Sequence, residues 1–244
     1  MIRWTTAFID LPATDLDETT TFWEGVTGFT RSATRGTAGE FASLMPADGD
    51  PYLGVQRTGD EHSRIHIDLH VDDIAAYADR AIELGATETN RDDFVAMHSP
   101  GGLPFCFVTH QASALAASAQ WPTGGASRVN QVCIDIPAAR WSAETEFWSA
   151  LTGWPYKPLT NEDFRLLHAD DQFALRMLMQ RDSRLRRVAA HLDVGASDRD
   201  REVIRHIELG AAEIEELDGW TRMIDPSGMP YCVTDRDPIS GRMR

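Results

Sequence analysis

The chain has 244 residues, which is enough for one large domain or two small ones. Hydrophobic residues make up 42% of it and charged residues 25%, an ordinary composition for a globular protein. Asp and Glu outnumber Lys and Arg by 38 to 23, and the formal charge of −15 repels phosphate backbones and anionic lipid surfaces. We therefore expect neither a nucleic acid nor a membrane as a partner.

The cysteines and the first residues predict a cytoplasmic protein. The three cysteines, Cys106, Cys133 and Cys232, are odd in number and widely spaced, unlike a disulfide framework. Residues 1–4 run directly into patterned sequence, without the basic and apolar leader of a secreted protein. No apolar run approaches the roughly 18 residues of a membrane-spanning helix.

The sequence contains two copies of one pattern. Residues 8–12, 22–28, 66–68 and 82–86 recur 125 positions later, and several residues of 97–106 recur 126 positions later, after one inserted residue. A register kept over so many matched positions indicates a duplicated domain. We predict a first domain (the first copy) over residues 1–112, an Ala- and Ser-rich linker over 113–126, and a second domain (the second copy) over 127–244.

Each copy contains a shorter pattern twice. Residues 8–11, 66–69, 133–136 and 191–194 alternate in polarity, which predicts four strands that each have one apolar face. A predicted helix follows each strand, and short strands come after the helices, for example at 52–56, 105–108 and 175–179. The turns before the final strands are 99–102 and 225–228. The predicted module is therefore a strand, a helix and about three strands, repeated four times.

Residues at the ends of the helices predict where the helices begin and end. An aspartate of the pair 72–73 is expected to cap one helix, and Ser197 is expected to cap the corresponding helix of the second copy. Ile82, Val203 and Ile207 are expected on the buried faces of these two helices. Glycines are expected to end the four helices, at Gly28, Gly85, Gly153 and Gly210.

These motifs, in this order, resemble the vicinal oxygen chelate superfamily, which includes glyoxalase I, bleomycin-resistance proteins and extradiol dioxygenases. The chain is most similar to the actinobacterial glyoxalase-like domains of that superfamily. The resemblance implies an α+β fold of two tandem domains, each a pair of βαβββ modules that form a cup-shaped, mostly antiparallel sheet with the helices outside. It is carried by residues 22–28, 66–73, 84–86 and 100–106 and by the second-copy residues 147–153, 191–194 and 225–232.

The resemblance also implies where a metal would bind. Metal-using members place four ligands, usually His, Glu or Gln, on the strands that face the cup. Carried onto this chain, the positions are Phe8, Gln56, His66 and Cys106 in the first copy and Cys133, Gln180, His191 and Cys232 in the second. A phenylalanine cannot ligate a metal, so Phe8 is assigned to substrate binding and the other seven residues to the metal.

Further polar side chains share the predicted strands. By alternation, Asp68 faces the cup beside His66, and Asp193 faces it beside His191. Either aspartate could be a general base in a partly closed site, and Asp68 could replace the missing ligand of the first copy. The residues expected to bind substrate are Phe8, Asp10, His70 and Asp135. The histidines expected in loops or at the surface are His62, His98, His110, His168 and His206.

The predicted ligands do not determine which metal binds. The first copy lacks a carboxylate ligand unless Asp68 supplies one, whereas Cys133, His191 and Cys232 form a softer set that is closer to zinc ligation. We expect either a divalent metal, namely zinc, iron, nickel or manganese, or no cofactor.

Three functions therefore stay open. The first is a metal-assisted lyase, isomerase or dioxygenase that acts on a small organic molecule. The second is a metal-free binding or resistance protein that closes over an aromatic or antibiotic-like ligand. The third is a metal-free enzyme with Asp68 or Asp193 as its base. The chain is expected to be a monomer with pseudo-twofold domains or a homodimer.

Overall fold

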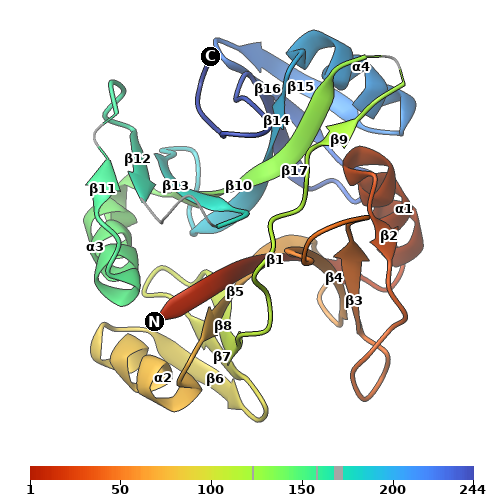
Figure 1. The fold of residues 1–244 in the computed structure, drawn as a ribbon. Coiled ribbons are helices and arrows are strands. Elements are labelled where there is room, and N and C mark those ends of the chain that lie inside the picture. The colour runs from red at the N-terminus through yellow and green to blue at the C-terminus, as the bar shows by residue number, and fades with distance from the viewer. Residues whose placement is uncertain (123, 158, 168–172) are drawn as a thin grey trace. The chain divides into compact units, whose positions relative to one another are not determined.

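The computed structural model describes residues 1–122, 124–157, 159–167 and 173–244 (Figure 1). His168, expected in a loop, lies outside the described residues. A short 3-10 helix, η1 (Ala138–Arg140), precedes one of the α-helices. The α-helices in the described ranges are α1 (Leu16–Thr27), α2 (Ile74–Glu83), α3 (Trp141–Thr152) and α4 (Arg199–Glu208).

The strands repeat the same order in both copies, and each group of one strand, one helix and three strands is a predicted module. The strands of the first copy are β1 (Ile2–Pro12), β2 (Thr30–Arg31), β3 (Phe41–Met45), β4 (Leu53–Thr58), β5 (Arg64–Val71), β6 (Thr87–Arg91), β7 (Val95–His98) and β8 (Pro104–Thr109). After β9 (Ala119–Gln120), the strands of the second copy are β10 (Ala126–Ile136), β11 (Tyr156–Lys157), β12 (Phe164–Leu167), β13 (Arg176–Arg181), β14 (Ala189–Ala196), β15 (Ala212–Leu217), β16 (Trp220–Ile224) and β17 (Pro230–Thr234).

The strands form two mixed sheets of equal connectivity. One sheet has the order β2-β3-β4-β1-β5-β8-β7-β6, and the other has the order β11-β12-β13-β10-β14-β17-β16-β15, with β9 paired to β10. Strands β5 and β8 pair in parallel, as do β14 and β17, whereas the hairpins are antiparallel. The α+β class and the four βαβββ modules predicted from the sequence are confirmed.

The chain folds into two compact units, and each unit combines segments of both copies. The first unit comprises residues 1–8, 65–113 and 132–190, and the second unit comprises residues 9–64, 114–131 and 191–244. The predicted domain boundaries at residues 112 and 127 follow the repeat in the sequence and stay a prediction.

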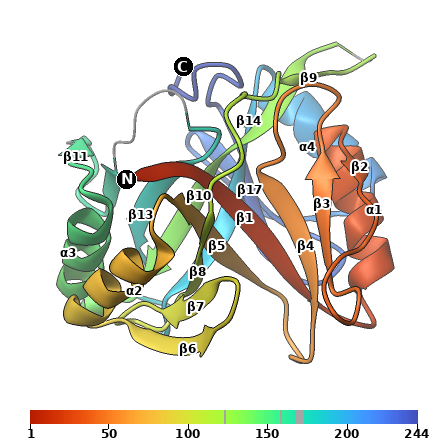
Figure 2. The same cartoon turned by 60° about the horizontal axis from the view of Figure 1, so that its bottom comes forward.

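In the first unit, aromatic side chains of both copies pack together. Helix α2 lies against β6, β7 and β8 (Figure 2). Phe105 on β8 contacts Phe147 and Trp148 on α3, with ring centroids 5.9 and 5.2 Å apart. Because large buried rings contribute much of the packing energy, the helix of the second copy is fixed to the final strand of the first.

The second unit repeats this packing with the corresponding residues. Helix α4 lies against β15, β16 and β17. Tyr231 on β17 contacts Phe22 and Trp23 on α1, with ring centroids 5.9 and 5.3 Å apart. In both units, the Phe-Trp pair of one copy therefore packs on the last strand of the other copy.

A buried carboxylate fixes the turn before β17 in the second unit. Asp225 accepts hydrogen bonds from the backbone N–H groups of Ser227 and Met229, at 2.9 and 3.0 Å, and from Trp23 Nε1 at 3.0 Å. Burial raises the pKa of Asp225, and these hydrogen bonds oppose that shift.

The first unit takes the corresponding carboxylate from a helix. Ser99 stands where the second copy has Asp225, and Glu144 on α3 stands where the first copy has Thr19. The Glu144 carboxylate accepts hydrogen bonds from Ser99 Oγ and from the backbone N–H of Gly101. Burial raises the pKa of Glu144 as well. One carboxylate per turn is thus kept, although its position in the sequence differs.

Helix α4 buries a different face from the one predicted. Val203 is buried as expected, but Ile207 is 45% exposed and His206, expected at the surface, is fully buried. His206 Nδ1 lies 3.0 Å from the Tyr231 hydroxyl, and His206 Nε2 lies 3.1 Å from the Glu202 carboxylate. A partner at each ring nitrogen makes this burial possible, because buried polar groups need hydrogen bonds.

The helix ends also differ in part from the prediction. Asp73 caps α2 by accepting from Ala76 N, as predicted. Asp198, and not Ser197, caps α4, because Ser197 Oγ accepts a hydrogen bond from Ala126 N instead. Ile82 on α2 is 45% exposed, contrary to the prediction, and the buried residues of that helix are the alanines at 78 and 81. The four predicted glycines have positive φ angles, as helix ends require.

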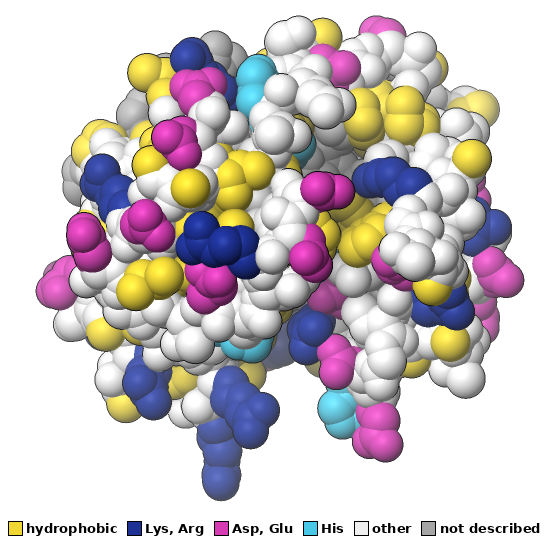
Figure 3. Space-filling view, turned by 90° about the horizontal axis from the view of Figure 1, so that it is seen from below, with side chains coloured by type: hydrophobic (Ala, Val, Ile, Leu, Met, Phe, Trp, Pro, Cys, Tyr) yellow, Lys and Arg dark blue, Asp and Glu magenta, His cyan; other side chains and the backbone are white. Residues whose placement is uncertain are grey.

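The surface mixes both signs of charge. On the face drawn in Figure 3, Lys and Arg side chains lie among Asp and Glu side chains and form no continuous basic area. The exclusion of nucleic acids stays a prediction from the net charge. In the described part of the chain, no helix has the length and the apolar composition needed to cross a bilayer.

The exchanged carboxylate gives a test of the packing in the first unit. We expect E144T to lower the free energy of unfolding by about 2 kcal/mol, because Ser99 Oγ and Gly101 N lose a buried acceptor. The double variant E144T/S99D reproduces the residues of the second unit and should regain more than half of that loss. Urea denaturation followed by tryptophan fluorescence measures both, with S99D alone as control. A double variant less stable than E144T would contradict the account.

The buried Glu202 predicts a dependence of stability on pH. Burial alone would raise the pKa of Glu202, but hydrogen bonds from Arg205 and His206 lower this pKa to about 2. The ionised carboxylate therefore stabilises the fold above pH 4.5, and this stabilisation is lost as the pH falls towards 2. We expect E202Q to cost up to about 3 kcal/mol at pH 7 and little near pH 2. Thermal unfolding across this range measures it, and a cost independent of pH would contradict the assignment.

Candidate metal centre

One strand junction brings a histidine, an aspartate and a cysteine together in the first copy. Strands β5 and β8 pair in parallel with Asp68 directly opposite Cys106. His66 precedes Asp68 by two residues and so lies on the same face of β5. His66 Nε2 lies 3.4 Å from Asp68 Oδ1, and the three ligand atoms all lie within 4.8 Å of one another.

The second copy builds the same group at the corresponding junction. Strands β14 and β17 pair in parallel with Asp193 directly opposite Cys232. His191 Nε2 lies 3.2 Å from Asp193 Oδ1 and 3.5 Å from Cys232 Sγ. All three side chains are buried; in the first copy the Asp68 side chain is 13% exposed and Cys106 is half-buried.

The hairpin between the two strands accommodates the difference in length between the copies. The second copy has its one inserted residue in the segment that corresponds to residues 86–97. The β6–β7 and β15–β16 ladders contain a register shift at corresponding places, so the extra residue lies nearer the turn of the hairpin. The register of β17 is not altered, and Cys232 faces Asp193 as Cys106 faces Asp68.

In each of these two groups, one oxygen of the aspartate has no hydrogen bond. Asp68 Oδ1 and Asp193 Oδ1 are buried and accept none, although each faces a histidine Nε2. Such an oxygen is costly unless a proton or a cation lies in front of it. Nitrogen, oxygen and sulfur donors at these spacings suit a zinc-type divalent ion, which takes three protein ligands in catalytic sites and keeps one position open. The residues present therefore fit a metal.

The two groups differ in what surrounds the aspartate. In the second copy, Gln131 is fully buried and its Nε2 donates a hydrogen bond to Asp193 Oδ2. In the first copy, the corresponding residue is Thr6, whose hydroxyl lies 2.9 Å from His70 Nε2. Burial lowers the pKa of His70, and the nearby Asp68 opposes that shift.

The two copies also differ at the predicted ligand position on β1 and β10, where the first copy has Phe8 and the second has Cys133. The Phe8 ring stacks on the His66 ring in the first unit, with centroids 5.0 Å apart and an interplanar angle of 5°. The corresponding residue, Cys133, is fully buried beside Leu166 and Leu178, and its Sγ lies 3.5 Å from Gln180 Oε1. In the first copy, a ring therefore covers one face of the histidine.

The other predicted site residues have contacts of their own. The buried Asp10 carboxylate pairs at 3.0 Å with Arg64, whose side chain is exposed. Gln56 is half-buried on β4, opposite Phe41. Asp135 Oδ1 lies 4.0 Å from Cys133 Sγ. The four residues predicted for each copy are divided between the two units, and their roles stay a prediction.

Sequence reasoning missed Gln131 as a part of the site. Its only signal is its place two residues before Cys133, which puts both side chains on the same face of β10. Assigning it a role required the position of Asp193, which the sequence does not give.

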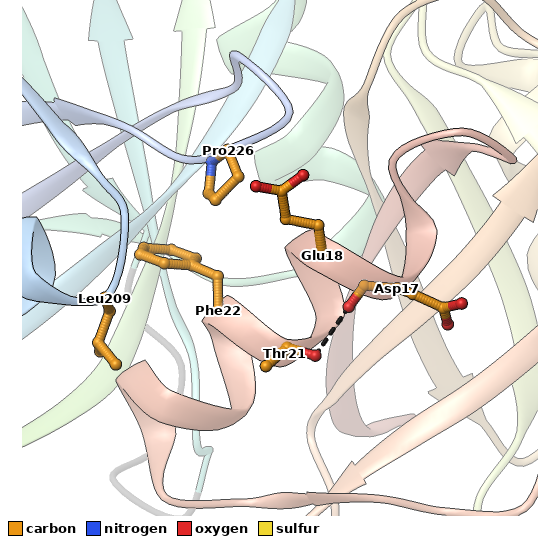
Figure 4. A pocket seen from close by; sticks show the side chains of 6 residues that line it. All are labelled: Asp17, Glu18, Thr21, Phe22, Leu209 and Pro226. Carbon is orange, nitrogen blue, oxygen red and sulfur yellow. Dashed lines mark hydrogen bonds between the residues drawn. The ribbon is translucent and has the colours of Figure 1, made fainter.

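A separate pocket of about 380 Å³ lies on the second unit (Figure 4). Thr21 Oγ1 donates to the backbone oxygen of Asp17, and the Asp17 carboxylate is paired with Arg31 at 2.9 Å. The lining offers no set of metal donors and no nucleophile, so it is not the candidate site. The residues that line it are Asp17, Glu18, Thr21, Phe22, Leu209 and Pro226.

Comparison with known proteins shows a family that the chain matches. The glyoxalase-like domain family matches the chain twice, over residues 6–108 and 131–234. Among curated proteins, no match is found.

Solved structures share the fold over nearly the whole chain. A 2,2',3-trihydroxybiphenyl 1,2-dioxygenase from Sphingomonas wittichii strain RW1 has a TM-score of 0.66 and 14% identity, covering 96% of this chain and 90% of that one. A Mn(II)-bound glyoxalase from Novosphingobium aromaticivorans has a TM-score of 0.67 and 15% identity, covering 96% and 81%. A mutant 4-hydroxymandelate synthase from Streptomyces coelicolor has a TM-score of 0.63 and 14% identity, covering 96% and 94%. At these identities, the likeness shows a common fold alone.

Proposed function

The chain belongs to the glyoxalase-like domain family, and on that premise we propose that it is a metal-assisted enzyme acting on a small organic molecule. The observation that carries the proposal is the buried group of His191, Asp193 and Cys232 in the second copy. Its orphaned oxygen, Asp193 Oδ1, faces His191 Nε2 at 3.2 Å with the Cys232 thiol 3.5 Å from the same nitrogen.

The solved relatives support this class of function. One is named as a Mn(II)-bound glyoxalase, and another is named as a dioxygenase that acts on a trihydroxybiphenyl. Both names describe reactions of small organic molecules. They support the class, and the residues of this chain must decide the type of reaction.

The donor set favours a lyase or an isomerase over a dioxygenase. A thiol ligand beside an imidazole and a carboxylate is typical of zinc sites. Zinc has no redox chemistry, so it suits reactions that move protons or break bonds without an electron acceptor. Bound at His191, Asp193 and Cys232, such an ion would act as a Lewis acid towards an oxygen of the substrate.

In this proposal the first copy has a different task. His66, Asp68 and Cys106 form the same group, but Phe8 stacks on His66 and leaves one face of its ring covered. A phenylalanine where the second copy has a cysteine removes one possible metal ligand, and an aromatic lining suits a metal-free site for a flat, partly apolar ligand. The metal-free binding function is therefore our second candidate, confined to the first copy.

The metal content of the purified chain tests the proposal. We expect about one zinc-type ion per chain in protein prepared without tags or chelators, because one copy has three buried donors. H191A should lose the ion, because it removes the central nitrogen ligand. H66A is the matched control in the first copy and should retain it. Elemental analysis measures all three.

The outcomes separate the candidate functions. Loss of the ion in H66A with retention in H191A would move the metal to the first copy and contradict the assignment. A chain that contains no metal and takes up none when zinc, iron, nickel or manganese is added would overturn the metalloenzyme proposal. Saturable binding of aromatic ligands to that metal-free chain would then support the binding function.

A further inference from the structure

We infer that Gln131 is a positioning residue: it orients the Asp193 carboxylate for metal binding in the second copy, and the first copy has no counterpart. This inference rests on the proposed function, because it concerns the same group of donors. It adds a residue that neither the repeat nor the predicted ligand positions include.

The hydrogen bond from Gln131 determines which oxygen of Asp193 faces the histidine. The Gln131 amide nitrogen can only donate, so Asp193 Oδ2 must accept there. With Oδ2 fixed, Oδ1 is directed to His191 Nε2 at 3.2 Å and has no other partner. The buried amide thus holds the carboxylate in the orientation that a cation needs.

Partners of this kind are typical of metal sites. Ligating carboxylates are usually hydrogen-bonded on the oxygen that does not bind the metal, and this bond fixes their orientation. Gln131 is 0% exposed, so water does not compete for its amide. Its Oε1 is buried without a hydrogen bond, and so the residue is retained at a cost in folding free energy.

The first copy uses the corresponding positions differently. Thr6 replaces Gln131, and its hydroxyl contacts His70 and not Asp68. His70 in turn stands where the second copy has Gly195. The aspartate of the first copy therefore lacks the amide that orients Asp193.

The second copy has no room for the first copy's arrangement. A Cβ atom at Gly195 would overlap the Asn130 amide nitrogen and would lie 3.0 Å from the Arg236 carbonyl oxygen. A histidine at position 195 would force the Asn130 side chain to move and would lie tightly against the Arg236 carbonyl oxygen. The two copies therefore use these positions differently: Thr6 contacts His70 in the first, whereas Gln131 donates to Asp193 in the second and Gly195 leaves its space to Asn130.

Cobalt binding to the full chain tests this role. After chelator treatment, the protein is titrated with Co²⁺, and the near-ultraviolet absorption that a cysteine thiolate gives with bound Co²⁺ is recorded. We expect one site whose absorption is absent in C232S. The nearly isosteric variant Q131M should weaken Co²⁺ binding by about 10- to 100-fold, the usual effect of removing a partner of a metal ligand.

The neighbouring amide provides the matched control. Asn130 is equally buried but donates to the Asp237 carbonyl oxygen and not to Asp193. N130A should leave Co²⁺ affinity within about threefold of wild type, and an equal loss in both variants would show a merely structural effect and overturn the inference. If Q131M does not fold, as judged by circular dichroism, Q131N takes its place, because its amide is one methylene too short to reach Asp193 in the same way.

The remaining outcomes distinguish this inference from the proposed function. Wild-type protein that binds Co²⁺ through Cys232, with Q131M within threefold of it, would overturn the role of Gln131 and leave the proposed function standing. Wild-type protein that gives no thiolate absorption with Co²⁺ and takes up no Zn²⁺ by elemental analysis would overturn both.

Discussion

The parallel pairing of two strands is the constraint on which the candidate site depends. In each copy, it places an aspartate directly opposite a cysteine, and the period of two along the strand adds a histidine on the same face. Backbone hydrogen bonds therefore set the spacing of the donors. The one-residue insertion of the second copy lies in the adjoining hairpin, where it leaves this register intact.

The two copies share this strand register but differ in the residues that form hydrogen bonds around it. The turn before the last strand keeps one buried carboxylate, from Asp225 in one unit and from Glu144 in the other. The place beside the site aspartate is filled by Gln131 in the second copy, while Thr6 and His70 pair in the first. The first exchange conserves a buried hydrogen-bonding requirement while moving the residue that meets it, and the second changes the contacts of the site aspartate. A duplicated fold can in this way keep its stability and acquire two sites of different chemistry.

Much of the fold could be predicted from the sequence, because alternation and the repeat are local signals. They predicted the four modules, the strands of the sites and the glycines at the helix ends. They did not predict that Trp23 packs on Tyr231 of the other copy, since a repeat shows which residues correspond and not which residues touch. His206 was misplaced for a related reason: its burial depends on Tyr231 and Glu202, which supply its hydrogen bonds. Gln131 was missed because its role exists only beside Asp193.

The proposed metal site consists of a histidine, an aspartate and a cysteine of the second copy that together hold one divalent ion. X-ray absorption at the zinc edge of the zinc-loaded chain shows which atoms surround the ion. With these three ligands, we expect one sulfur neighbour at about 2.3 Å together with nitrogen and oxygen neighbours at about 2.0–2.2 Å. In C232S, the sulfur neighbour should disappear while the nitrogen and oxygen neighbours remain. A zinc ion surrounded by nitrogen and oxygen alone in the wild-type chain would rule out this site.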